Sequence, residues 1–265
     1  MTLNDIETGI VLAVDKPYGW TSFQVVNKIK WQIKRDLGVK KFKIGHAGTL
    51  DPLATGLLLV CVGKATKRID ELQNGRKVYT GTIVLGATTP CFDLERAIDA
   101  YYPTTHLTED LIRETSRQFV GDIEQVPPMF SAVKVDGARA YSYARNGELT
   151  EIAAKRVSVY SFDIPAIRNL GCDTPVPSLE TLSSPAADTH EKELYRHPQG
   201  IVPPMLPQVD FRICCGKGTY IRSIARDLGL ALGSGAFLSA LRREQVGSYS
   251  VADAIHIESG KDVSF

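Results

Sequence analysis

The chain has 265 residues and a mass of 29.0 kDa, with 43% hydrophobic residues, 23% charged residues and a mean hydropathy of −0.08. These values suit an ordinary globular protein of one large domain and exclude a collagen, a coiled coil or a wholly disordered chain. No apolar run approaches the roughly 18 residues of a membrane-spanning helix, and the acidic N-terminus is unlike a signal or transit peptide. We therefore expect a cytoplasmic protein without membrane contact.

The formal net charge is only +1, but the charges are unevenly distributed. Residues 16–77 carry thirteen Lys or Arg against four acidic residues, and residues 212–243 carry six against one. Residues 91–125 carry three basic and eight acidic residues. Two basic regions around an acidic one are typical of a polyanion-binding face, although solvated helix faces would give the same counts.

The sequence predicts no metal centre and no disulfide framework. The cysteine count is odd and includes a vicinal pair without C-x-x-C spacing, and the histidines lack H-x-x-x-H spacing. The five cysteines, which we expect to be reduced thiols, are Cys61, Cys91, Cys172, Cys214 and Cys215.

Hydrophobic periodicity and turn residues predict alternating strands and helices. The predicted elements are, in chain order, a strand over 9–14, a helix from 21 or 22 to about 37, a glycine-rich loop over 45–56, a buried strand over 57–62, a short helix over 65–72, a strand over 78–85, a helix over 107–120, a strand over 157–167, a strand over 211–215, a turn and helix over 218–232 and a last helical turn over 238–243.

The first long helix has a clear beginning and end in the sequence. Thr21 or Ser22 caps it, Gly38 stops it, and its expected buried stripe includes Phe23. The rest of that stripe is Val26, Ile29 or Lys30, and Ile33. The helix over 107–120 has an expected stripe of Leu111, Ile112, Thr115 and Phe119.

Two segments depart from this regular pattern. Residues 127–155 interleave Tyr and Arg with Pro-Pro, Asp-Gly and Asn-Gly turns, which indicates an excursion from the core. Residues 170–207 hold seven of the fourteen prolines, so we expect a surface insertion there.

Candidate chemistry lies in two glycine-rich stretches. Asp51 sits before Pro52 in the loop over 45–56, where glycines allow close approach of a ligand, although an aspartate before proline is also a common turn former. Lys217 and Arg222 flank the start of a helix and suit a phosphate or a carboxylate. Tyr79, on a strand, is by default a core aromatic residue. Gly63-Lys64 lacks P-loop spacing, which excludes nucleotide hydrolysis at this site.

Taken together, these stretches resemble the TruB family, which makes pseudouridine at position 55 in the T loop of tRNA. GHAGTLDPLATG at 45–56 resembles the family's signature loop, and the supporting blocks follow in family order over most of residues 9–250. These blocks are DKP at 15–17, GKAT at 63–66, the strand over 77–86, the thumb-like segment at 121–145, GKGTYIRSIARDLG at 216–229 and the closing turn at 241–243.

The resemblance implies a fold and catalytic residues. The implied fold is an α/β (α+β) pseudouridine synthase catalytic domain over 1–265, with a mixed, mainly antiparallel sheet flanked by helices and loops. Asp51 corresponds to the catalytic aspartate, by covalent attack or by abstraction of a ribose proton. Tyr79 is expected to stack on the flipped uracil, and Arg222 to pair with Asp51 and keep it ionised.

The resemblance also implies substrate-binding residues. His46 is expected to touch the T-loop nucleotides, Lys16 to support the active-site loop, and Tyr220 to lie against the nucleotide. Leu241 is expected to pack on the active site, and Asp93 ends a stretch that matches the family only in part. Gly48 completes this set.

The implied reaction needs no cofactor and no metal, and the implied partner of a monomeric enzyme is the T-arm stem-loop of tRNA. Two departures from the family are visible. The usual C-terminal RNA-binding domain is expected to be absent, and residues 170–207 lie where a tight connection is usual. The alternatives are a pseudouridine synthase acting on another RNA, perhaps with a guide RNA, and a tRNA-binding folding factor.

Overall fold

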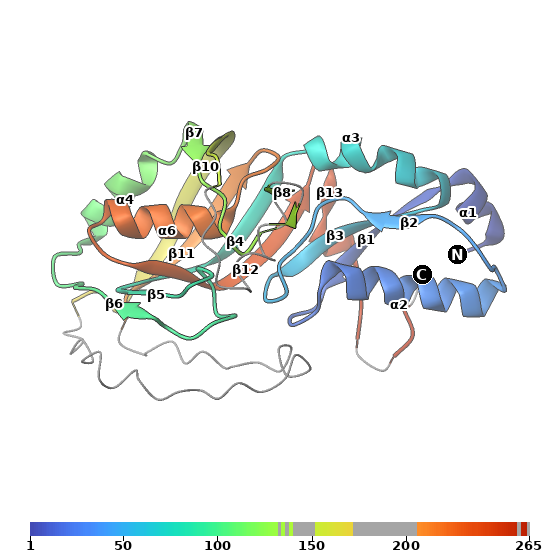
Figure 1. Ribbon diagram of the computed structural model, residues 1–265, viewed down its shortest axis with the longest axis horizontal. Helices are drawn as coiled ribbons and strands as arrows, with labels where there is room; N and C mark the ends of the chain where they lie inside the picture. Colours follow the sequence, from blue (N-terminus) through green and yellow to red (C-terminus); the bar gives the residue numbers. More distant parts are fainter. Residues whose placement is uncertain (132–133, 136–137, 140–151, 172–205, 259–260, 264–265) are drawn as a thin grey trace. The chain divides into compact units, whose positions relative to one another are not determined.

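The computed structural model describes residues 1–131, 134–135, 138–139, 152–171, 206–258 and 261–263. The chain forms two compact units (Figure 1). Unit 1 comprises Met1–Thr80 and Leu241–Phe265, and unit 2 comprises Gly81–Ala240. Strands β4 (Lys77–Leu85) and β12 (Ala236–Val246) each run from one unit into the other. The prediction of one catalytic domain over 1–265 therefore stays a prediction.

Unit 1 is built on the strand order β14-β1-β3-β12-β4. Strand β1 pairs antiparallel with β3 from Ile10 opposite Val62 to Lys16 opposite Gly56, whereas β14 on β1 and β12 on β3 are parallel. The further elements of this unit are α1 (Leu3–Thr8), β1 (Ile10–Lys16), α2 (Ser22–Leu37), β2 (Ile44–His46), β3 (Thr55–Val62), η1 (Gly63–Arg68), α3 (Ile69–Asn74), β13 (Tyr249–Ser250), η3 (Val251–Asp253) and β14 (Ile255–His256).

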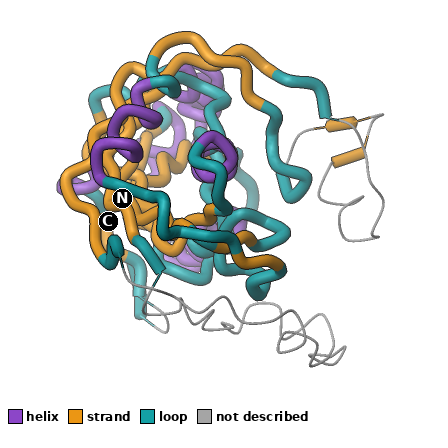
Figure 2. The backbone as a smooth tube through the Cα atoms, turned by 90° about the vertical axis from the view of Figure 1, so that its left-hand side faces the viewer, coloured by secondary structure: helices purple, strands orange, loops and turns teal. Residues whose placement is uncertain are grey.

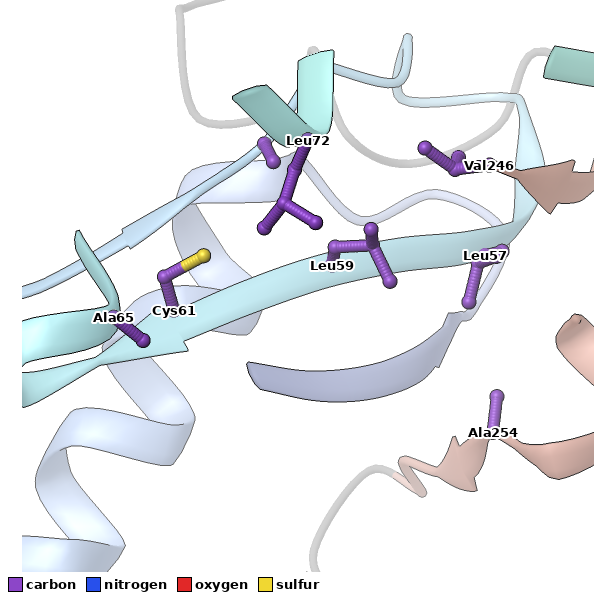
Figure 3. Close-up of a cluster of buried hydrophobic side chains, with 8 residues drawn as sticks. Leu57, Leu59, Cys61, Ala65, Leu72, Val246 and Ala254 are labelled. Carbon is purple, nitrogen blue, oxygen red and sulfur yellow. The ribbon is translucent and has the colours of Figure 1, made fainter. Parts of the chain in front are cut away.

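The core of unit 1 lies around β3, whose residues from Gly56 to Val62 are all buried. Side chains alternate along a strand, so Leu57, Leu59 and Cys61 share one face and pack with Leu72 of α3 (Figure 3). The continuous apolar run predicted over 57–62 is therefore a strand covered on both sides.

Helix α2 confirms the predicted boundaries. Thr21 and Gln24 form a reciprocal capping box, and Gly38 ends the helix with φ of 64°. The predicted stripe is wrong at Phe23, which is 68% exposed. The buried face instead includes Val25 and Gln32, each directly before a correctly predicted apolar residue.

Unit 2 is built on the strand order β12-β4-β11-β10-β7, with mainly antiparallel pairing. Strands are the commonest regular element of the described chain (Figure 2). A core cluster of Val84, Ala87, Leu206 and Phe237 lies in this unit. Its further elements are β5 (Ala87–Thr88), β6 (Ala100–Tyr101), α4 (Glu109–Arg117), β7 (Gly121–Gln125), β8 (Lys134–Val135), β9 (Ala138–Arg139), β10 (Lys155–Arg168), β11 (Gln208–Cys215) and α6 (Ile221–Ala231).

The mixed, mainly antiparallel α/β class is confirmed, but three local predictions are wrong. Residues 238–243 form part of strand β12, because pairing with neighbouring strands overrides their helix propensity. Leu111 is exposed, and the helix over 107–120 is shorter than expected, ending at Arg117. The predicted helix over 65–72 is a 3₁₀ turn followed by α3.

Parts of the two irregular segments lie outside the described residues. Within 127–155, β8 and β9 pair antiparallel, and residues 132–133, 136–137 and 140–151 are not described. Almost all of the expected insertion over 170–207 is likewise outside the described chain. In the described part, no helix is long and apolar enough to cross a membrane.

Candidate active site

The loop that carries Asp51 connects β2 to β3 in unit 1 and is held from several sides. Asp51 begins a tight turn in which the Ala54 amide donates to the Asp51 carbonyl oxygen over 3.1 Å. The Leu50 amide donates to the Ser22 hydroxyl over 2.9 Å, and that hydroxyl donates to the Leu50 carbonyl oxygen over 3.2 Å. The start of α2 therefore fixes the residue that precedes Asp51.

Lys16 fixes the residue that follows Asp51. Its side chain is fully buried, and its Nζ donates to the carbonyl oxygens of Pro17, Trp20 and Pro52 over 3.0, 2.5 and 3.0 Å. Three carbonyl dipoles thus solvate a buried ammonium group. The ammonium ties the end of β1 to the Asp51 turn. The role in supporting the active-site loop that the resemblance implies for Lys16 stays a prediction.

Arg243 braces the same loop from β12. It is 1% exposed, and its guanidinium donates to the carbonyl oxygens of Leu57 over 2.7 Å and of Gly48 over 3.0 Å. Gly56 must be glycine for this approach, because its φ is +97° and a Cβ there would lie 2.3 Å from the Arg243 carbonyl oxygen. Gly48, whose φ is +102°, lies nearer the start of the loop and is held there by the Arg243 guanidinium.

An ion pair in unit 1 involves Asp15, the residue before Lys16. Arg242 donates to both carboxylate oxygens of Asp15 over 3.0 and 2.7 Å. Neither Arg243 nor this pair is among the site residues predicted from sequence. The sequence does contain a signal for the ion pair, since Asp15 and Arg242 both lie in stretches that resemble family motifs. A motif, however, does not show which of its side chains contact one another.

Tyr79, Leu241 and His46 also belong to unit 1. Tyr79 on β4 is only 8% exposed, and Leu241 on β12 is half-buried, with β4 and β12 adjacent in the strand order. His46 ends β2 opposite Val60 of β3. Burial lowers the pKa of His46 and the nearby Arg243 guanidinium lowers it further, so the neutral imidazole is favoured.

Arg222 is the centre of a second cluster, in unit 2. It is 4% exposed, and its guanidinium donates to the carbonyl oxygens of Phe130 over 2.8 Å and of Cys91 over 3.2 Å. Its Nε lies 3.8 Å from Oδ2 of Asp93, which is also buried. Asp93, whose motif matches the family only in part, is thus placed beside Arg222.

The turn that presents Asp93 is strained and internally bonded. Phe92 has φ of 60°, in the left-handed region that side chains rarely adopt. The Thr89 hydroxyl donates to the Asp93 carbonyl oxygen over 2.7 Å, and the Glu95 amide donates to Oδ1 of Asp93 over 3.0 Å. Burial, followed by the Asp93 charge, raises the pKa of the Cys91 thiol to about 12.

Tyr220 sits immediately before α6 and is tied to β7. Its amide donates to Oε1 of Gln125 over 2.8 Å, and Nε2 of Gln125 donates to the Tyr220 carbonyl oxygen over 3.1 Å. The Ser223 hydroxyl donates to the Val126 carbonyl oxygen over 2.8 Å. The end of β7 therefore fixes the first turn of α6, from which Arg222 projects.

The predicted site residues thus fall into two groups. Unit 1 holds Lys16, His46, Gly48, Asp51, Tyr79 and Leu241, and unit 2 holds Asp93, Tyr220 and Arg222. The predicted pairing of Arg222 with Asp51 stays a prediction. No group of three or more His, Cys, Asp or Glu residues that could hold a metal ion occurs among the described residues.

Comparison with protein families decides what this chain is. Residues 34–176, more than half of the chain, match the family described as TruB family pseudouridylate synthase (N terminal domain). The chain belongs to the TruB family. In addition, residues 222–264 match the family described as tRNA pseudouridylate synthase B C-terminal domain. Whether the usual TruB C-terminal RNA-binding domain is absent, as expected from the sequence, is not decided by this match and stays a prediction.

Curated relatives extend the TruB match over nearly the whole chain. A protein of Flavobacterium johnsoniae named tRNA pseudouridine synthase B is 47% identical over 258 residues, which are 97% of this chain and 96% of that protein. A protein of the same name from Phocaeicola vulgatus is 48% identical over 255 residues, 96% of this chain and 93% of that protein.

Solved structures share the fold. The crystal structure of a Cbf5-Nop10-Gar1 complex matches 96% of this chain with 27% identity and a TM-score of 0.59. The structure of an H/ACA RNP bound to a substrate RNA containing 2′-deoxyuridine matches 96% with 25% identity and a TM-score of 0.55. This chain spans only about half of the length of those matching chains, 54% and 52%.

Proposed function

We propose that this protein is a cytoplasmic tRNA pseudouridine synthase that isomerises the uridine at position 55 of the T loop. The observation that carries the proposal is the 47% identity over 97% of the chain to a protein named tRNA pseudouridine synthase B. The braced Asp51 loop supports it, because a catalytic carboxylate must be held in a fixed position.

The reaction sets demands that the Asp51 loop meets. The bond between ribose C1′ and uracil N1 breaks, the base turns, and a bond forms between C1′ and C5. The proton on C5 is then lost and N1 gains one, so atoms and electrons balance without a redox partner. A carboxylate serves this sequence either by covalent attack or by removing a ribose proton. We assign that carboxylate to Asp51.

The remaining site residues take supporting roles in the same proposal. A uracil must leave the base stack before it reacts, and Tyr79 offers an aromatic ring on which it stacks. Arg222 orients a carboxylate through its guanidinium, which three contacts in unit 2 hold in place. His46, Gly48, Tyr220 and Leu241 contact the nucleotides.

The proposed partner of this monomeric enzyme is the T-arm stem-loop of tRNA. Its phosphates meet the basic regions over 16–77 and 212–243, so binding weakens as salt rises. We expect added salt to raise KM more than it lowers kcat, since phosphate contacts act mainly on affinity.

Mapping the product tests the proposal. An unmodified tRNA transcript is incubated with the protein, treated with a carbodiimide that marks pseudouridine, and read by primer extension. One stop at the T-loop uridine is expected, and none in a transcript with cytidine at that position. Pseudouridine at another position would overturn the assignment to position 55, and pseudouridine formed only after a second RNA is added would show that the enzyme depends on a guide RNA.

A further inference from the structure

Helix α2 presents an outer face whose composition is unusual for a solvated surface. Phe23 is 68% exposed and Trp31 is 60% exposed, on a helix whose opposite face packs into unit 1. Single exposed apolar side chains are common, but two large aromatics on one helix face are not explained by packing. The other exposed residues of this face are Gln24, Asn27, Lys34 and Arg35.

The surroundings of these aromatics are strongly basic. Residues 22–43, which are α2 and the segment after it, carry seven Lys or Arg and one acidic residue. Lys34, Lys40, Lys41 and Lys43 are exposed, and Lys28 and Lys30 are half-buried. Aromatic rings set among basic side chains are the combination with which proteins stack bases and neutralise phosphates.

The Trp31 ring is in contact with a side chain that is itself anchored. The Arg35 guanidinium lies 4.9 Å from the centroid of the Trp31 ring, and Arg35 donates to both carboxylate oxygens of Asp262 over 2.9 Å each. Asp262 in turn is fixed through its neighbour Val263, whose amide donates to Oε1 of the buried Gln32 over 2.7 Å. A preset ring loses less conformational entropy on binding.

The helix that carries this face is connected to the proposed catalytic loop. Ser22, which precedes Phe23, exchanges hydrogen bonds with Leu50 next to Asp51. From Phe23 to Trp31 the helix rises about 12 Å, or roughly the length of three to four nucleotides of a strand. The N-terminal end of α2 is therefore fixed to the residue that precedes Asp51.

We propose that the outer face of α2, centred on Phe23, Trp31 and Lys34, is an RNA-docking surface that grips the substrate tRNA outside the reacting nucleotide. The identity of the RNA rests on the proposed function, and the surface itself rests on exposure and charge. Lys34 contacts phosphate and the aromatic rings contact bases or sugars. Arg35 positions the Trp31 ring but adds no net positive charge to the surface, because Asp36 and Asp262 pair with it.

Fluorescence gives a direct test that does not depend on turnover. The chain has two tryptophans, Trp20 and Trp31. We expect an unmodified tRNA transcript to quench the wild-type emission, and Trp31→Phe to lose most of this quenching. Equal quenching in wild type and Trp31→Phe would overturn the proposal.

Affinity supplies the second readout. Trp31→Ala is expected to weaken tRNA binding and raise KM by about tenfold, with kcat unchanged, because base stacking is lost. Lys34→Gln is expected to lower the slope of log Kd against log salt by about one. Arg117→Gln and Leu3→Ala, at exposed positions outside both basic regions, are controls expected to bind as wild type.

The two proposals fail in different ways. Normal modification of tRNA together with unchanged binding by Trp31→Ala and Lys34→Gln would overturn the docking surface and leave the proposed function standing. Quenching and salt effects as expected, with no pseudouridine formed by the wild-type protein, would overturn the proposed function and leave α2 as an RNA-docking surface.

Discussion

Replacing Lys16 by methionine tests how the Asp51 loop is held. Methionine nearly matches the length of the lysine side chain but cannot donate hydrogen bonds. Lys16→Met therefore leaves the carbonyl oxygens of Pro17, Trp20 and Pro52 without their buried donor. The cavity left is small, so the change isolates the loss of the ammonium group.

The magnitude follows from the three contacts. Each hydrogen bond to a charged group contributes about 1.5–3 kcal/mol, and the relieved burial of the ammonium offsets part of the loss. We expect a net loss of about 3 kcal/mol in the free energy of unfolding. For a chain of this size each kcal/mol lowers Tm by about 2–4 °C, which predicts a fall of about 6–12 °C.

Thermal unfolding and steady-state kinetics at a temperature where the variant is folded measure the two consequences. We expect kcat to fall by about tenfold or more, because displacing Pro52 moves Asp51. Lys77→Met is the matched control, since Lys77 is also a buried lysine whose Nζ donates to backbone carbonyls, those of Gln73 and Gly75. It is expected to lose stability but keep most of its kcat. An unchanged Tm and kcat in Lys16→Met would show that the Lys16 ammonium does not hold the Asp51 loop.

Three further predictions follow from the same geometry. Gly56→Ala is expected to lose more than about 2 kcal/mol of stability, because its Cβ meets the Arg243 carbonyl oxygen, and a wild-type urea midpoint would contradict this. Asp93→Asn is expected to lower kcat about tenfold while KM changes less, and equal changes would instead make Arg222 a phosphate contact. The pKa of His46 is lowered in the folded protein, so its stabilising contribution is present above pH 6.5 and is lost as the pH falls through the folded-state pKa. His46→Gln is therefore expected to make the free energy of unfolding depend less on pH. An unchanged pH profile would contradict this.

The sequence predicts best those elements whose local signals agree with their packing. Helix α2 has a capping box at Thr21, a glycine at its end and an apolar stripe, and its boundaries are confirmed. Strand β3 is a run of apolar residues before a turn, and it is the core of unit 1. In both cases the local preference and the tertiary environment favour the same structure.

Strand β12 shows why other elements were not predictable from local preference. Its Ala, Leu, Arg and Glu residues favour a helix, yet β3 and β4 flank it in the sheet. One signal was present: Gly247-Ser248 forms the two-residue loop that turns β12 into β13, with Gly247 at φ of 56°. A hairpin interpretation of that dipeptide would have predicted the strand.

The candidate site divides in the same way. Motif resemblance predicts Asp51, Tyr79 and Arg222, because each lies in a stretch of the chain that resembles a family motif. It does not predict Arg243, whose importance comes from donating to the carbonyl oxygens of Gly48 and Leu57, far from it in sequence. Contacts between a side chain and a distant backbone leave no pattern in a single sequence.

Tritium release from an unmodified tRNA transcript labelled at C5 of uridine tests most directly whether Asp51 catalyses pseudouridine formation in the T loop. Wild type is compared with Asp51→Asn, which removes the charge but keeps the shape, on the normal transcript and on one without the T-loop uridine. We expect release only by wild type on the normal transcript, with tRNA binding by Asp51→Asn retained. Release by Asp51→Asn at the wild-type rate would contradict the claim that Asp51 is the catalytic carboxylate.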